Sequence, residues 1–295
     1  MKDLKNKIFL HKQKIIMSAK NMIPNSVFRI KNNVIHNIAS IIADAVDIIV
    51  HKKTIAIPKN VFIYWTGPKP RMIKELESIM EMNLSEFNLI KLNESNVTEY
   101  IDIPSRFHKL IPAHQADFVR VACIAKYGGI YVDADTIVMK DFEKLFQING
   151  RKEGFFVRHH DGQIMNSIFG SHRDTKIMRR WLKYIYEYIE NNEKLEWNDI
   201  GSVFLVKLHR KGMLSSYLML NGEKNIMPIF YENILNEFIN KPYENYKNIE
   251  RGFQPAVCIF NCVYNTLESM PDVNLYGDRM PISYFMKKAK DTQTN

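Results

Sequence analysis

The sequence has little cysteine and no long apolar run, and both shortages exclude classes of protein. The three cysteines, Cys123, Cys258 and Cys262, are too few for a disulfide framework and fit a reducing compartment. Cys258 and Cys262 stand four residues apart without a second ligand pair, so a zinc site is not expected. No uninterrupted apolar segment approaches the roughly 20 residues that cross a bilayer. We therefore expect a folded, cytoplasmic protein.

Positive charge is concentrated in the first 33 residues. This segment has eight basic residues against Asp3 alone, which accounts for seven of the nine net positive charges of the 295-residue chain. A basic arm on a nearly neutral body is typical of contact with an anionic membrane or another polyanion. It is equally typical of a solubilising terminal arm. Nucleic acid is not an expected partner, because the arm has few aromatic residues and no nucleic-acid-binding motif accompanies it.

Residues 34–50 have the pattern of an amphipathic helix. Their apolar side chains recur at helical spacing, and the polar ones share the opposite side. The polar face carries two acidic residues, Asp44 and Asp47, whereas helices that lie on membranes are usually basic there. Packing against a core or a subunit is therefore the favoured role. We divide the chain into residues 1–55, a basic arm with an amphipathic helix, and residues 56–295, the main domain.

Strand and helix patterns alternate along the main domain. Strands are predicted at 61–65, 88–92, 130–132, 154–157 and 163–169, and helices at 71–82, 112–128 and 174–190. Alternation of this kind predicts a parallel sheet with helices on both faces. Ligands of such sheets bind beyond the carboxyl ends of the strands. Residues 199–295 have weak periodicity, and a mixed sheet with helical insertions is expected there.

Residues 112–136 have the clearest chemical pattern. A predicted helix carries Asp117 and Arg120, which are three residues apart and therefore share one face. After Gly128-Gly129, an apolar strand leads to Asp133 and Asp135. Side chains alternate along a strand, so we expect both carboxylates to point to the same side at its carboxyl end. Two hard oxygen ligands suit Mg²⁺ or Mn²⁺, which completes its shell with substrate phosphates and water.

These motifs, in this order, resemble the sugar-transferring enzymes of glycosyltransferase family 32, whose bacterial branch includes capsular-polysaccharide and lipopolysaccharide glycosyltransferases. The family pattern is Asp-x-x-Arg, Tyr-Gly-Gly-x-Tyr and Asp-x-Asp, found here at 117–120, 127–131 and 133–135. The resemblance extends over residues 56–170 and is weaker beyond. It implies a GT-A type nucleotide-sugar-binding α/β fold, with a central, mostly parallel mixed sheet flanked by helices. The chain adds an N-terminal helical extension and helical insertions in the C-terminal half.

The resemblance also implies roles for individual residues. Asp117 would accept hydrogen bonds from the donor sugar, and Arg120 would support the sugar and the diphosphate. These two are the predicted catalytic residues. Asp135 would bind Mn²⁺ or Mg²⁺ directly, while Asp133 would contact the nucleotide ribose and reach the metal directly or through water.

Three further residues of the predicted donor site each have two possible roles. Trp65 would stack on the uracil, although a Trp at the end of a strand also suits the core. Asn166 would bind the donor sugar or the acceptor, with a buried structural role as the alternative. Cys258 stands where the family has a His that helps to close the metal site, and a soft thiolate ligand suits Mg²⁺ or Mn²⁺ poorly. Either a further water takes its place, or Asn261 or Asp278 does, and the sequence leaves this open.

The expected activity is that of a metal-dependent hexosyltransferase of capsule or lipopolysaccharide biosynthesis. It would transfer a hexose from a UDP-sugar to a glycan or lipid-linked glycan acceptor, with retention, at the inner face of the cytoplasmic membrane. Two alternatives remain open. Residues 130–135 also resemble the first motif of haloacid-dehalogenase phosphatases, in which Asp133 would be the nucleophile, although Thr136 departs from that motif. The departure at Cys258 also suits a non-catalytic nucleotide-sugar binder.

Overall fold

The computed structural model describes residues 57–147, 152–226, 235–240, 253–270, 274–277 and 279–291. The basic arm, the predicted helix at 34–50 and Asp278 lie outside these residues, and so does the side chain of Asn261. The division near residue 55 and the expected membrane contact therefore stay predictions. Among the helices of the described residues, none has the length and apolar character needed to cross a membrane.

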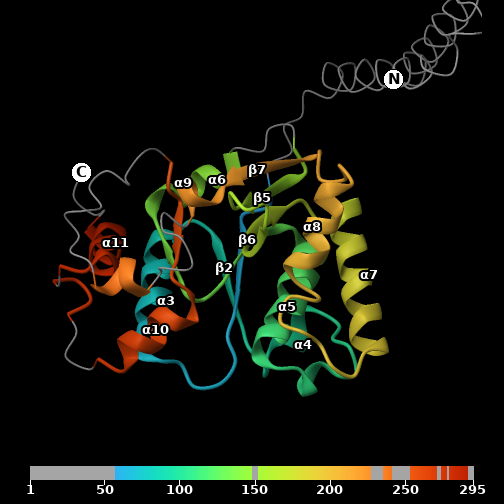
Figure 1. The fold of residues 1–295 in the computed structure, drawn as a ribbon, viewed down its shortest axis with the longest axis horizontal. Helices are drawn as coiled ribbons and strands as arrows, with labels where there is room; N and C mark the ends of the chain where they lie inside the picture. The colour runs from blue at the N-terminus through green and yellow to red at the C-terminus, as the bar shows by residue number, and fades with distance from the viewer. Residues whose placement is uncertain are drawn as a thin grey trace, which may run out of the picture. The chain divides into compact units, whose positions relative to one another are not determined.

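A six-stranded mixed sheet forms the centre of the described fold (Figure 1). In spatial order its strands are β2 (Asn88–Leu92), β1 (Asn60–Tyr64), β3 (Gly129–Val132), β6 (Ile164–Ser171), β5 (Gly154–Arg158) and β7 (Tyr217–Asn221). Only β6 runs against its neighbours; β1, β2, β3, β5 and β7 are mutually parallel. The five parallel strands therefore end at one edge of the sheet, which we call the carboxyl edge.

Helices cover both faces of this sheet (Figure 1). On one face lie α4 (Val97–Tyr100), α5 (Pro112–Tyr127), α7 (Lys176–Asn191) and α8 (Ser202–Arg210), packed on a core that includes Phe118, Tyr131, Phe169 and Trp181. On the other face lie α3 (Arg71–Asn83), α10 (Phe260–Glu268) and α11 (Pro281–Lys290). The predicted α/β class, with a mostly parallel mixed sheet between helices, is confirmed.

Shorter elements join these layers. Strands β4 (Thr136–Val138) and β8 (Ala256–Cys258) form a two-stranded antiparallel sheet, which brings the C-terminal part of the chain beside the segment that follows β3. The remaining short elements are α6 (Lys144–Gln147), α9 (Gly222–Asn225), two 3₁₀ turns at Phe107–Lys109 and Lys140–Glu143, and a π-turn at Asn236–Asn240.

Two glycines form the connection from α5 to β3. Gly128 ends the helix with φ of 67°, and Gly129 continues at φ of 120°, so both positions have backbone that favours glycine. A Cβ at Gly129 would come within 2.4 Å of the carbonyl oxygen of Asn60. The chain can therefore reverse its direction in a very short space, and β3 enters the sheet directly beside β1.

Candidate active site

The reversal at Gly128-Gly129 places the N-terminal half of α5 near the end of β3. Helix α5 leads toward the start of β3, so its first turns lie at the carboxyl edge of the sheet. Pro112 supplies the pre-set backbone angle of a first helical turn. Asp117 and Arg120 follow in the next two turns and are buried, at 6 % and 5 % exposure.

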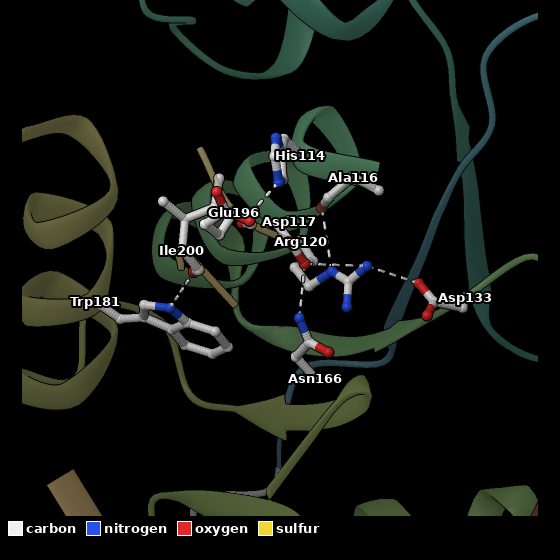
Figure 2. A network of polar contacts seen from close by, with 9 residues as sticks. All are labelled: His114, Ala116, Asp117, Arg120, Asp133, Asn166, Trp181, Glu196 and Ile200. Atoms are coloured by element: carbon white, nitrogen blue, oxygen red, sulfur yellow. Dashed lines mark hydrogen bonds and ion pairs between the residues drawn. The ribbon is translucent and has the colours of Figure 1, made fainter. Parts of the chain in front are cut away.

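Arg120 joins the carboxylate of Asp117, on its own helix α5, to the carboxylate of Asp133, which follows β3 (Figure 2). Its Nη2 lies 3.0 Å from Oδ1 of Asp133 and 3.5 Å from Oδ1 of Asp117, and its Nε donates to the carbonyl of Ala116 at 3.2 Å. The guanidinium also lies over the ring of Tyr131, with its Cζ 4.9 Å from the ring centroid. The sequence predicted that Asp117 and Arg120 would be neighbours, and the structure adds Asp133 to them.

Asn166 and Gly201 enclose Asp117 from the other side. The amide Nδ2 of Asn166 donates to Oδ1 of Asp117 at 2.6 Å. A Cβ added at Gly201 would come within 2.6 Å of that Nδ2 and within 3.3 Å of both carboxylate oxygens of Asp117. The structure thus brings the predicted residue Asn166 to Asp117. It also reveals Gly201, which lies in the weakly periodic part of the sequence and was not among the predicted site residues.

The two acids of the Asp-x-Asp motif lie in the turn after β3. The strand ends at Val132, so the alternation of a strand does not set the direction of Asp133 and Asp135, and their pointing to the same side stays a prediction. The amide of Asp133 still donates to the carbonyl of Ser167 on β6 at 2.8 Å, which fixes the start of the turn. The side chain of Asp133 is 26 % exposed, and Asp135 is half-buried.

Asp135 has no ion-pair partner among the described residues, unlike Asp133. Burial, and then the charge of Asp133, raise the pKa of Asp135 from 3.8 to about 7. Burial also raises the pKa of Asp117, to about 6, although Arg120 opposes the shift. The pKa of Asp133 is raised by burial as well, against the effect of Arg120. The site therefore has more carboxylates than cations to balance them, and a bound cation would correct this imbalance.

The donor set fits a hard divalent cation that relies on its substrate for ligands. Within the described part of the chain, no group of three or more His, Cys, Asp or Glu side chains is placed to hold a metal. Asp133 and Asp135 would supply carboxylate oxygens, and diphosphate and water would supply the rest. The thiol of Cys258 is buried within 3.5 Å of Thr136 Oγ1, and burial raises its pKa to about 12, so it stays protonated. Because a soft thiolate also suits Mg²⁺ or Mn²⁺ poorly, the carboxylates of Asp133 and Asp135 are the better ligands in this site.

Trp65 follows β1 at the same edge of the sheet. Its backbone amide donates to the carbonyl of Leu92, and its indole Nε1 donates to the carbonyl of Pro68 at 3.3 Å. The half-buried indole meets Tyr264 edge to face, with ring centroids 5.9 Å apart. Burial and the charge of Asp135 raise the pKa of Tyr264. Trp65 and Tyr264 thus lie on the side of the Asp-x-Asp turn opposite to α5, and stacking on a base stays a prediction.

The raised pKa values predict a pH dependence of folding stability without metal. Folding raises the pKa of these carboxyl groups, so their protonated forms favour the folded state. This contribution to stability is complete below the pKa of the unfolded chain, near 3.8, and is lost as the pH rises through the folded pKa values of about 6 for Asp117 and about 7 for Asp135. Asp135→Asn should therefore gain stability relative to the natural protein between pH 5 and pH 7.5. Urea unfolding of both proteins in the presence of a chelator measures this difference. An equal pH dependence in the two proteins would contradict the assigned charge state of Asp135.

The family of the chain agrees with this site. The family model described as capsular polysaccharide synthesis protein matches residues 7–265, and the chain belongs to this family. Membership confirms the predicted role in capsular polysaccharide synthesis, and a glycosyltransferase activity is consistent with that role. It does not confirm glycosyltransferase family 32 itself. The comparison with curated proteins gives no match.

Several solved structures share parts of the topology at low identity. One is a glycosyltransferase involved in the glycosylation of the major capsid of PBCV-1, at 11 % identity, covering 72 % of this chain and 98 % of that chain with a TM-score of 0.42. Another is galactosyltransferase LgtC with donor and acceptor sugar analogues, at 9 % identity, 80 % and 97 % coverage and a TM-score of 0.40. A third, the PaToxG glycosyltransferase, has 15 % identity, 59 % and 80 % coverage and a TM-score of 0.39.

Proposed function

We propose that this protein is a metal-dependent hexosyltransferase that uses a UDP-sugar as donor and a surface glycan as acceptor. The observation that carries the proposal is the network of Asp117, Arg120 and Asp133 beside the carboxylate of Asp135, which has no ion-pair partner in the described part of the chain. A nucleoside diphosphate with its cation supplies the charges that this arrangement requires. The acceptor would be a growing capsular or lipopolysaccharide chain, free or lipid-linked. The basic arm would hold the enzyme at an anionic membrane surface.

The bound cation would neutralise the diphosphate and assist its departure as a Lewis acid. Arg120 is fixed by Asp133 and Asp117, and its charge favours the phosphates and the sugar next to them. Asp117 is only 6 % exposed and already bonded, so we assign it a positioning role toward Arg120 and Asn166. This replaces the direct sugar contact that the resemblance implied.

The stereochemistry that we propose is retention. In a retaining transfer without a protein nucleophile, the acceptor hydroxyl attacks the anomeric carbon from the face that the diphosphate leaves. The bond to the diphosphate oxygen breaks, the bond to the acceptor oxygen forms, and the acceptor proton passes to the departing diphosphate. Asn166, held by Asp117, is the side chain that we propose to orient the sugar during this exchange.

The nucleoside end of the proposed site is tested by Trp65→Ala. Loss of a base-stacking indole costs about 1–3 kcal/mol, so the Kd for UDP in the presence of Mn²⁺ should rise by about 5- to 150-fold. Trp65→Phe should keep most of the affinity. Isothermal titration gives the Kd, and thermal unfolding shows whether the fold is retained. A variant that unfolds instead would show that Trp65 is a core residue, and an unchanged Kd would exclude stacking.

The proposed reaction is tested by release of products from the full chain. With Mn²⁺ and a panel of UDP-hexoses, at least one donor should be hydrolysed or transferred with release of UDP, and a chelator should stop the reaction. Release of inorganic phosphate from p-nitrophenyl phosphate, without any release of UDP, would support the phosphatase alternative and overturn the proposal.

A further inference from the structure

Trp197 is the most exposed large apolar side chain among the described residues. Its exposure is 60 %, compared with 47 % for Ile111 and 38 % for both Leu235 and Met270. Exposing an indole costs free energy that burial would recover, at about 25 cal/mol per Å² of apolar surface. An indole kept in solvent by a well-ordered backbone is therefore a candidate for a binding function.

The segment around Trp197 is fixed by hydrogen bonds from side chains of two helices, α5 and α7, and of the turn that holds Arg106. From the turn, Arg106 donates to the carbonyls of Asn192 and Glu193, and from α5 the ring of His114 bonds the carbonyl of Glu196. From α7, Tyr184 donates to the carbonyl of Asp199 and Trp181 to the carbonyl of Ile200. Tyr188, also on α7, donates to the carboxylate of Asp199. Asp199 also accepts from the amide of Glu196 at 2.8 Å. The segment 192–201 thus holds its shape without using the indole of Trp197 as an anchor.

This segment leads directly to the proposed active site (Figure 2). Its last residue, Gly201, touches Asp117 and Asn166, and Glu196 contacts His114, one turn before Asp117 on α5. Three residues lie between Trp197 and Gly201, so four steps along the chain limit the distance between their Cα atoms to about 14 Å. The amide of Gly201 also donates to the carbonyl of Asn198, and this turn shortens the path further. The Cα atom of Trp197 therefore lies no more than about 14 Å from Gly201, which borders the site where a sugar donor is proposed to react.

The surroundings of the indole indicate the chemistry of its ligand. Glu196 and Asn198 flank Trp197 and are both exposed, so hydrogen-bonding groups stand on either side of a flat apolar surface. A sugar ring has the matching surface, with an apolar face of C–H groups and a rim of hydroxyls. A membrane surface fits less well, because Glu193 and Glu196 oppose the single Lys194, and membrane-contacting segments are usually basic.

We propose that Trp197 is the stacking platform of an acceptor subsite, which binds a sugar ring of the glycan that receives the transferred hexose. This inference rests on the proposed function, since it places the acceptor beside the donor site. Asn198 and Glu196 bind the hydroxyl rim of the same ring. Asn166 and Gly201 mark the boundary between this subsite and the donor sugar.

Glycan binding by the full chain tests the subsite. The protein is applied with Mn²⁺ and UDP to an array of capsular and lipopolysaccharide oligosaccharides, and its UDP affinity is measured separately by calorimetry. Trp197→Ala should weaken retention by the best-bound glycans about tenfold, as expected for loss of a central aromatic anchor. Trp197→Phe should restore most of the binding. Met270→Ala, which removes an exposed apolar side chain from the other helix layer, should leave it unchanged.

The outcomes distinguish a failure of the acceptor subsite from a failure of the proposed transfer from a UDP-sugar. Unchanged UDP affinity with loss of glycan binding in Trp197→Ala supports the subsite. Unchanged glycan binding in that variant, or no glycan retained by the natural protein that binds UDP, overturns it. Loss of binding to phosphatidylglycerol vesicles alone would identify Trp197 as a membrane contact and also overturns it. Absence of UDP binding in the natural protein would instead refute the proposed function.

Discussion

Asp135→Asn is expected to abolish Mn²⁺-dependent release of UDP while leaving the fold intact. The amide keeps the shape of the side chain but removes the charge that favours a divalent cation. Metal ions contribute several kcal/mol to the stabilisation of a departing diphosphate, so the rate should fall by a factor on the order of 10³. The variant should fold, because folding already raises the pKa of Asp135 to about 7 and thus disfavours its charge.

A matched control is available a few residues away. Asp141 is an exposed carboxylate that pairs with Lys144, so Asp141→Asn makes the same chemical change outside the site and should keep the natural rate. Both variants are assayed for UDP release over a range of Mn²⁺ concentrations. Full activity of Asp135→Asn at low Mn²⁺ would exclude Asp135 as a metal ligand.

Arg120→Ala is expected to cause the largest loss of stability. Removing one partner of a buried ion pair costs about 3–5 kcal/mol, because the remaining charge is left uncompensated. Here two carboxylates, those of Asp117 and Asp133, would lose the same cation, and the ring of Tyr131 would lose its stacked guanidinium. The loss should be smaller at pH 5 than at pH 8, because the unpaired carboxylates can take up protons at the lower pH.

Arg179→Ala is the control for this prediction. Arg179 pairs with Asp174 on the surface, where both side chains are more than half exposed, and such pairs contribute about 0–1 kcal/mol. Urea unfolding at the two pH values gives the free energies for both variants. A loss below about 1 kcal/mol for Arg120→Ala at pH 8 would mean that the buried network does not stabilise the fold.

The α5–β3 unit was predictable because its signals are local. Pro112 and Gly128 mark the ends of the helix, the spacing of Asp117 and Arg120 puts them on one face, and the apolar residues before Asp133 form a short strand. The same signals located β1, β2, β5, β6 and α7 within a few residues of their observed bounds.

The enclosure of the site was not predictable, because it depends on contacts between distant segments. Gly201 meets Asp117 across more than 80 residues, and no periodicity in the sequence encodes that approach. Strand β7 pairs with β5 in parallel, and Cys258 pairs with Thr136 in the β4–β8 ladder. Such pairings are chosen by tertiary packing, and local propensity carries little information about them. The exposed Trp197 lies between the predicted helix at 174–190 and the weakly periodic residues 199–295, and it gave no sequence signal of its own.

Electron paramagnetic resonance of Mn²⁺ tests the central claim most directly, because it separates bound from free ion. We expect the natural protein to bind one Mn²⁺ tightly when UDP is present and much more weakly without UDP, because the diphosphate supplies part of the ligand shell. Asp135→Asn should lose this binding, and Asp141→Asn should retain it. Equal binding of Mn²⁺ by all three proteins, or tight binding that does not depend on UDP, would contradict the claim that these carboxylates hold a nucleotide through a cation.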